Sequence, residues 1–144
     1  MTTRREAREI ALQALYQLDV TGDADAQAGL ALFWRHLQAG KDEDAFAREL
    51  VDGVRGNRER IDALIAESAE HWRLPRLSRV DLSLLRLATY ELMERHEIPA
   101  SVTIDEAIEI ARRFGSEDSP SFVNGVLDHI AAILGVKEKR GEPG

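Results

Sequence analysis

Three arginines near the N-terminus are the first side chains whose type and spacing could do chemistry. When the segment is projected as an α-helix, Arg4, Arg5 and Arg8 fall within an arc of about 100°, with two glutamates to one side. Guanidinium groups on one face can hold phosphates through paired hydrogen bonds, and Tyr16, farther along, offers a surface for base stacking. The alternative is a solvated helix end whose charges form ion pairs one turn apart.

A second candidate site is the segment 112–122, which joins two predicted helices. It combines two arginines, a glycine turn, the start of the last helix and two phenylalanines. Free N–H groups at a helix start are a natural contact for phosphate, and unstacked RNA bases pack on aromatic rings. The alternative here is structural, with Phe114 and Phe122 in the core and with Asp118 and Ser119 as helix caps.

Residue patterns typical of catalytic or metal sites are missing from the sequence. The chain has no cysteine, which excludes disulfides, thiolate metal sites and cysteine nucleophiles. The four histidines are His36, His71, His96 and His129, spread over different predicted helices and without the HExxH spacing. Glycine-rich loops of the GxGxxG or Walker type are also missing. We therefore expect a binding protein that is not an enzyme and uses no metal and no cofactor.

Composition sets the class of protein. The 144 residues, 44% of them apolar, suit one compact domain. The net charge of −7 comes from 19 basic and 26 acidic residues and neither half of the chain is basic, so an RNA site would have to be a local patch. No signal peptide is visible, and no stretch approaches the roughly eighteen uncharged apolar residues that a membrane span needs. We expect a cytoplasmic protein with no membrane contact.

Apolar periodicity predicts an all-α fold of about seven helices and no strand. The first three helices are expected over about 3–19, 26–38 and 42–55, and Asn57 is the predicted cap of the fourth. The break at Pro75 suggests two subbundles, about 3–72 and 77–135, within one domain (1–135) that is followed by a mobile polar tail (136–144). Thr103 with Glu106 fits a capping box, and Ser119 with Pro120 fits the start of the last helix.

Three stretches carry recognisable motifs, and the last of them is too long and idiosyncratic for a chance similarity. They are the arginine-rich start (4–16), the apolar helix 84–92 with Ile98-Pro99 after it, and the block from Asp105 through Arg113-Phe114-Gly115-Ser116-Glu117-Asp118-Ser119 to Asp128. In this order they resemble the NusB family of transcription antitermination factors over nearly the whole chain. Residues 22–72 match only in helical rhythm.

The resemblance implies a fold of two helical subdomains and a role in transcription of ribosomal RNA. NusB-like proteins bind the single-stranded boxA element of the nascent transcript as a heterodimer with the ribosomal protein NusE, and the complex joins other Nus factors on RNA polymerase. Asp81 would face the NusE partner. With the residues of the 112–122 segment included, the expected RNA contacts are Arg4, Arg5, Arg8, Tyr16, Arg113, Asp118, Ser119 and Phe122.

Two departures from the family pattern bear on RNA affinity. The family's arginine-rich start is often denser than the one here, which is interleaved with Glu6 and Glu9, and position 121, often lysine in relatives, is serine. Each missing cation near a phosphate weakens binding and flattens its salt dependence. We therefore expect weak RNA binding by the chain alone and useful affinity only with the partner.

Two alternative functions stay open. One is an RNA-binding module of the kind fused to ribosomal RNA cytosine methyltransferases, although a sequence ending at Gly144 has no room for the methyltransferase and a free-standing factor is expected. The other is a homodimeric helical scaffold with no RNA function, because some relatives form homodimers that cover the RNA face.

Overall fold

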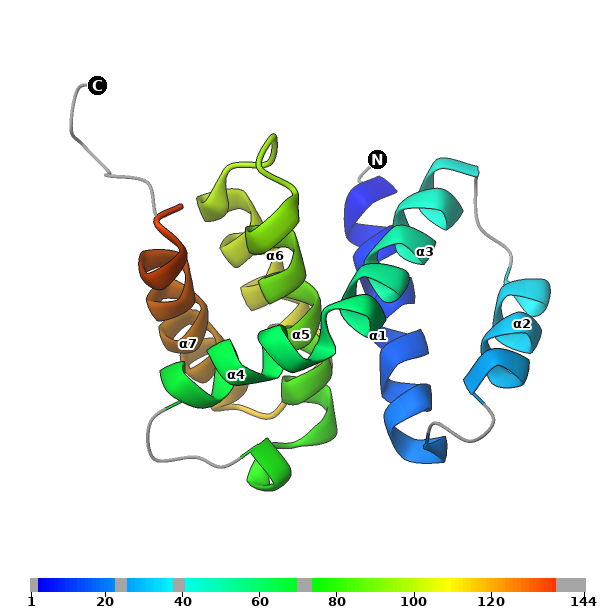
Figure 1. The fold of residues 1–144 in the computed structure, drawn as a ribbon, viewed down its shortest axis with the longest axis horizontal. Helices are drawn as coiled ribbons and strands as arrows, with labels where there is room; N and C mark the ends of the chain where they lie inside the picture. Colours follow the sequence, from blue (N-terminus) through cyan, green and yellow to red (C-terminus); the bar gives the residue numbers. More distant parts are fainter. Residues whose placement is uncertain (1–2, 23–25, 38–40, 70–73, 137–144) are drawn as a thin grey trace.

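The computed structural model describes residues 3–22, 26–37, 41–69 and 74–136, and every regular element in these ranges is a helix (Figure 1). The α-helices are α1 (Thr3–Thr21), α2 (Ala26–His36), α3 (Lys41–Gly56), α4 (Arg58–Ser68), α5 (Arg79–Glu94), α6 (Ala100–Phe114) and α7 (Ser119–Leu134), with a short 3-10 helix, η1 (Leu74–Arg76), before α5. The expected all-α fold is confirmed. None of the described helices is long and apolar enough to cross a membrane.

Helix α5 is the centre of the molecule. All twelve residues from Leu82 to Met93 are buried, because a helix that is apolar nearly all round must be covered on every side. Helices α1 and α3 pack on one side of it and α6 and α7 on the other, while α2 lies at the far edge against α1 (Figure 1). The two sides share one continuous core.

Helix α4 packs against other helices than those we expected. We placed it in an N-terminal subbundle (3–72), but it packs mainly against α5 and α7 (Figure 1). On these contacts the two groups of helices divide at Asn57, between α3 and α4, and not at Pro75. The reason is that a proline interrupts the local helix without deciding which side of the core the preceding helix covers. Of the expected mobile tail, Val136 packs on the core and 137–144 lie outside the described residues.

The predicted capping box at the start of α6 is wrong. The helix begins a full turn earlier, at Ala100, with Pro99 in the capping position. A proline has φ preset near the helical value, so the chain can enter the helix directly after it. Thr103 is therefore buried inside α6, and Glu106 points to α1 instead of back to a cap.

Two other predicted caps also serve different purposes. The Asn57 amide donates a hydrogen bond to the carbonyl oxygen of Gly53 (2.8 Å), which closes the end of α3 and makes no side-chain cap for α4. Asp118 occupies the cap position of α7, and Ser119 is the first residue of the helix. The Ser119 hydroxyl accepts a hydrogen bond from the backbone N–H of Ser116 (2.9 Å), which ties the turn before α7 to the helix.

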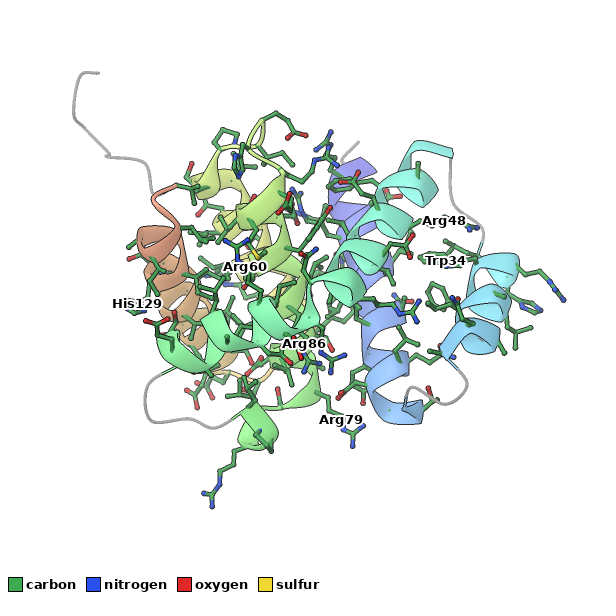
Figure 2. The ribbon with its side chains drawn as sticks, in the orientation of Figure 1. Trp34, Arg48, Arg60, Arg79, Arg86 and His129 are labelled. Atoms are coloured by element: carbon green, nitrogen blue, oxygen red, sulfur yellow. The ribbon has the colours of Figure 1, made fainter. Side chains whose placement is uncertain are left out.

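A buried arginine in the middle of α5, Arg86, fixes this helix against α4 and α1. Arg86 donates two hydrogen bonds to Asp62 of α4 (2.8 and 3.1 Å) and lies 3.7 Å from Asp19 of α1. Arg79 donates to the carbonyl oxygen of Asp19 (3.2 Å). Figure 2 shows Arg79 and Arg86 on the side of α5 that faces the C-terminal end of α1. These contacts hold α1, α4 and α5 in one arrangement.

Gly53 of α3 packs directly against the Tyr90 ring of α5. A Cβ atom built at this glycine would overlap the Tyr90 ring. We predict that Gly53→Ala destabilises the protein by about 1–3 kcal/mol, because overpacking outweighs the gain in helix propensity. Urea unfolding measures the effect. The matched control is Gly125→Ala in α7, where an added Cβ meets nothing within 4 Å; it should stabilise by up to about 1 kcal/mol. Equal shifts in the two variants would contradict the close approach.

Candidate nucleic-acid interface

The N-terminal arginines leave α1 in three different directions. Arg4 lies over the ring of Phe46 in α3, 4.6 Å from the ring centre. Arg5 reaches α6 and Arg8 reaches α5, each to a carboxylate. The expected single face of three phosphate-binding guanidiniums is therefore divided among three neighbouring helices.

Arg8 and Glu91 form a buried ion pair between α1 and α5. The guanidinium donates from Nε to Oε2 (2.8 Å) and from Nη2 to Oε1 (2.7 Å), and only 4% of the Arg8 side chain and 1% of the Glu91 side chain are exposed. The Arg8 side chain is thus buried in this structure, and its expected contact with RNA stays a prediction. The physical reason for the burial is its position four and seven residues before Leu12 and Leu15, which places all three on the buried face of the helix.

Arg5 and Glu106 form a second paired contact, between α1 and α6. Both hydrogen bonds measure 2.7 Å, and Arg8 lies 3.9 Å from the same carboxylate. Unlike the buried pair, this one is accessible, since 36% of the Arg5 side chain is exposed. The hydrogen bonds from Arg5, followed by its charge and that of Arg8, hold the pKa of Glu106 below its ordinary value.

The end of α6 carries the most exposed cations of this region. Arg113 donates to Glu9 of α1 (2.8 Å) with 63% of its side chain exposed. Arg112 is paired with Glu109 on its own helix. We call the six side chains that meet here, on α1 and α6, the arginine seam; they are Arg5, Glu9, Glu106, Glu109, Arg112 and Arg113.

An apolar groove of about 420 Å³ adjoins the arginine seam. Its walls are five side chains of α1 with Val80 of α5 and Phe114 of α6, and those of α1 are Leu12, Gln13, Tyr16, Gln17 and Val20. The aromatic walls are open to solvent, with Tyr16 42% and Phe114 39% exposed. The guanidinium of Arg113 lies over the Phe114 ring, 5.2 Å from its centre. The cation of the seam and the aromatic wall of the groove are therefore in contact.

Phe114 lines the groove but is not among the RNA contacts expected from the sequence, where it is a candidate core residue within the segment 112–122. The signal in the sequence was its place at the last position of an amphipathic helix, directly after two arginines, where a side chain projects past the end of the core.

The remaining expected contacts fall into different environments. Asp118 is exposed at the start of α7, and Phe122 is half-buried against the core. Ser119 is 1% exposed and holds the Ser116 backbone, so a direct RNA contact by its hydroxyl does not fit. Asp81 stands beside the groove residue Val80, and its Oδ1 atom is buried with no hydrogen-bond partner in the described part of the chain.

No metal cluster is formed by the residues that the structure describes, because no three of their acidic or histidine side chains come together. Three histidines are held by single hydrogen bonds: His36 Nδ1 lies 3.0 Å from the carbonyl oxygen of Leu32, His96 Nε2 lies 2.6 Å from that of Met93, and His129 Nδ1 lies 3.0 Å from the Ser68 hydroxyl. His71 lies outside the described ranges.

The arrangement at the seam and groove can bind anions and aromatic bases, which is the chemistry of nucleic-acid recognition.

Comparisons with known proteins bear on this surface. A family model described as the NusB family matches residues 5–132. The transcription antitermination protein NusB of Geobacter sp. (strain M21) is 49% identical over 146 aligned residues, which cover 96% of this chain and 100% of the relative.

Solved structures show the same fold. T. maritima NusB superposes with a TM-score of 0.81 at 45% identity, covering 90% of this chain and 90% of that one. A crystal structure of the antitermination factors NusB and NusE in complex with dsRNA matches with a TM-score of 0.79 at 27% identity, covering 92% of this chain and 98% of that one. The matched region includes every helix that builds the arginine seam and the groove.

We predict that Arg8→Met destabilises the protein by about 3–5 kcal/mol, because it leaves the Glu91 carboxylate buried without its partner. The double variant Arg8→Met with Glu91→Met removes both charges at similar volume and should recover most of the loss. Urea unfolding of the two variants gives the comparison. A double variant as unstable as the single one would show that the pair is not what Arg8 contributes.

The Glu106 carboxyl should titrate below its ordinary value of 4.5 in the folded protein, since Arg5 donates hydrogen bonds to the charged form. A depressed folded pKa contributes stability above the unfolded pKa, and this contribution is lost as the pH falls through the folded value. Arg5→Ala should raise the pKa of Glu106, measured by NMR titration of the carboxyl carbon. Arg112→Ala, which removes the cation next to Glu109, is the control; equal pKa values in wild type and Arg5→Ala would contradict the contact.

Proposed function

This chain belongs to the NusB family of transcription antitermination factors, and we propose that it acts by binding boxA-type RNA along the arginine seam and the adjoining groove, with a NusE partner. The observation that carries the proposal is the contact of Arg113 with the Phe114 ring, which joins an exposed cation to an open aromatic wall. Phosphates would meet the seam while unpaired bases enter the groove.

The chemistry of the two parts suits single-stranded RNA. Arg5 and Arg113 keep part of their N–H donors in solvent, where a phosphate can reach them. Tyr16 and Phe114 present rings on which bases can stack, and stacking requires bases that are not held in a duplex. Arg5, Glu9 and Tyr16 follow one another along a single face of α1, so one strand can contact the seam and the groove together.

A partner is needed because the chain supplies little positive charge of its own. The net charge is −7, and the exposed arginines of the seam already have carboxylate neighbours. NusE would add cations beside the seam. Asp81, which follows the groove residue Val80 in the sequence, is the residue proposed to face NusE; its Oδ1 atom has no hydrogen-bond partner in the described part of the chain, and an unpaired buried acceptor is costly.

The mode of action that we propose is binding without catalysis, in the cytoplasm, where bacterial transcription takes place. Bound RNA and NusE would connect the chain to the other Nus factors and to RNA polymerase. Self-association through the same groove would compete with RNA, and sedimentation at several protein concentrations distinguishes that arrangement.

We predict that Tyr16→Ala weakens the binding of boxA-type RNA to the complex with NusE by roughly 5- to 150-fold, the range expected for loss of one stacked base. Titration of fluorescent RNA at fixed moderate salt measures it, with a scrambled RNA for selectivity. The control is Ile133→Ala in α7, which removes an equally exposed apolar side chain outside the groove. Unchanged affinity in Tyr16→Ala would remove the groove from the proposal.

A further inference from the structure

Every arginine of the arginine seam lies beside a carboxylate. Arg5 faces Glu106 across the two helices, Arg113 faces Glu9, and Arg112 faces Glu109. The three cations and three carboxylates cancel, so the surface that would receive phosphates carries no net charge of its own. The charge of Glu9 and that of Glu109 also act on Arg5, which shows that the carboxylates influence the seam as a group.

These pairs differ from the buried one in how easily they open. Arg8 and Glu91 are both nearly inaccessible, and separating them would leave a charge in the core. The Arg112–Glu109 pair is open on both sides, with 61% of Arg112 and 41% of Glu109 exposed, whereas the Arg113–Glu9 pair is open on the arginine side, with 63% of Arg113 and 15% of Glu9 exposed. Solvent screens the attraction of both guanidiniums to their carboxylates. Exposed pairs contribute little to stability and can exchange partners at small cost.

We propose that Glu9 and Glu109 act as internal competitors of the RNA backbone, occupying the guanidiniums of Arg113 and Arg112 until phosphates displace them. The inference rests on the proposed RNA-binding function and adds a role for acidic residues that would otherwise count only against binding. Their effect is to lower the part of the affinity that does not depend on sequence, since phosphates carry no sequence information. The affinity for every RNA falls by the same factor, so an RNA needs the additional contacts of bases in the groove to bind tightly.

The competition has a signature that a purely structural role would not produce. In Glu9→Gln the Arg113 guanidinium keeps a neutral hydrogen-bond acceptor but gains freedom to contact a phosphate. Affinity for boxA-type and scrambled RNA should rise by the same factor, roughly two- to fivefold at moderate salt. The plot of log affinity against log salt should become steeper by about 0.7, the slope of one additional phosphate contact on a single strand.

The experiment titrates both RNAs at several salt concentrations with wild type, Glu9→Gln and Glu109→Gln, each in complex with NusE. Glu59→Gln, an exposed carboxylate on α4, is the matched control for the change in net charge. The double variant Glu9→Gln with Arg113→Ala tests the route, because the gain should disappear when the released guanidinium is missing. Thermal unfolding verifies that each variant is folded.

The outcomes separate the two proposals. Tighter binding and a steeper salt slope in Glu9→Gln and Glu109→Gln, but not in Glu59→Gln, support the competition. If the wild type binds boxA-type RNA and the three single variants all bind it with equal affinity, the inference is overturned and the proposed function stands. A gain that persists without Arg113 would also overturn it. If the wild-type complex binds neither RNA, both the competition and the proposed function are wrong.

Discussion

The buried pair of Arg8 and Glu91 is the constraint on which the binding surface depends. Two charges removed from water are costly unless their hydrogen bonds are nearly all satisfied, and the paired contact does this only when α1 and α5 meet in one register. In that register Arg5 reaches Glu106, and Tyr16 comes beside Val80 and Phe114. A shift of α1 by one residue relative to α5 would break the ion pair and separate the side chains of α1 from the other walls of the groove.

One residue type therefore serves three purposes in this small protein. Arg8 and Arg86 are buried and position helices, Arg4 covers an aromatic ring, and Arg113 stands in solvent beside the Glu9 carboxylate. This division also reconciles an acidic chain with a role in binding RNA. The number of cations matters less than how many of them have partners that a phosphate can replace.

Local patterns were sufficient for the helices, because apolar periodicity depends on neighbours within a few turns. They were insufficient wherever the partner is distant in the chain. Arg8 stands in the middle of the arc formed with Arg4 and Arg5, yet its carboxylate lies 83 residues away. The same limit explains why α4 was assigned to the wrong group of helices and why Glu106 looked like a cap. The groove required the folded structure, since its walls come from three helices.

Photocrosslinking tests the central claim, that RNA lies over the arginine seam and the groove, most directly. A boxA-type RNA carrying photoreactive thiouridine would be irradiated in the complex with NusE, and the modified peptides identified by mass spectrometry. The account predicts crosslinks in the part of α1 that holds Tyr16 and in the turn from Phe114 to Phe122. Crosslinks confined to α2 or α4, with those two segments unmodified, would contradict it.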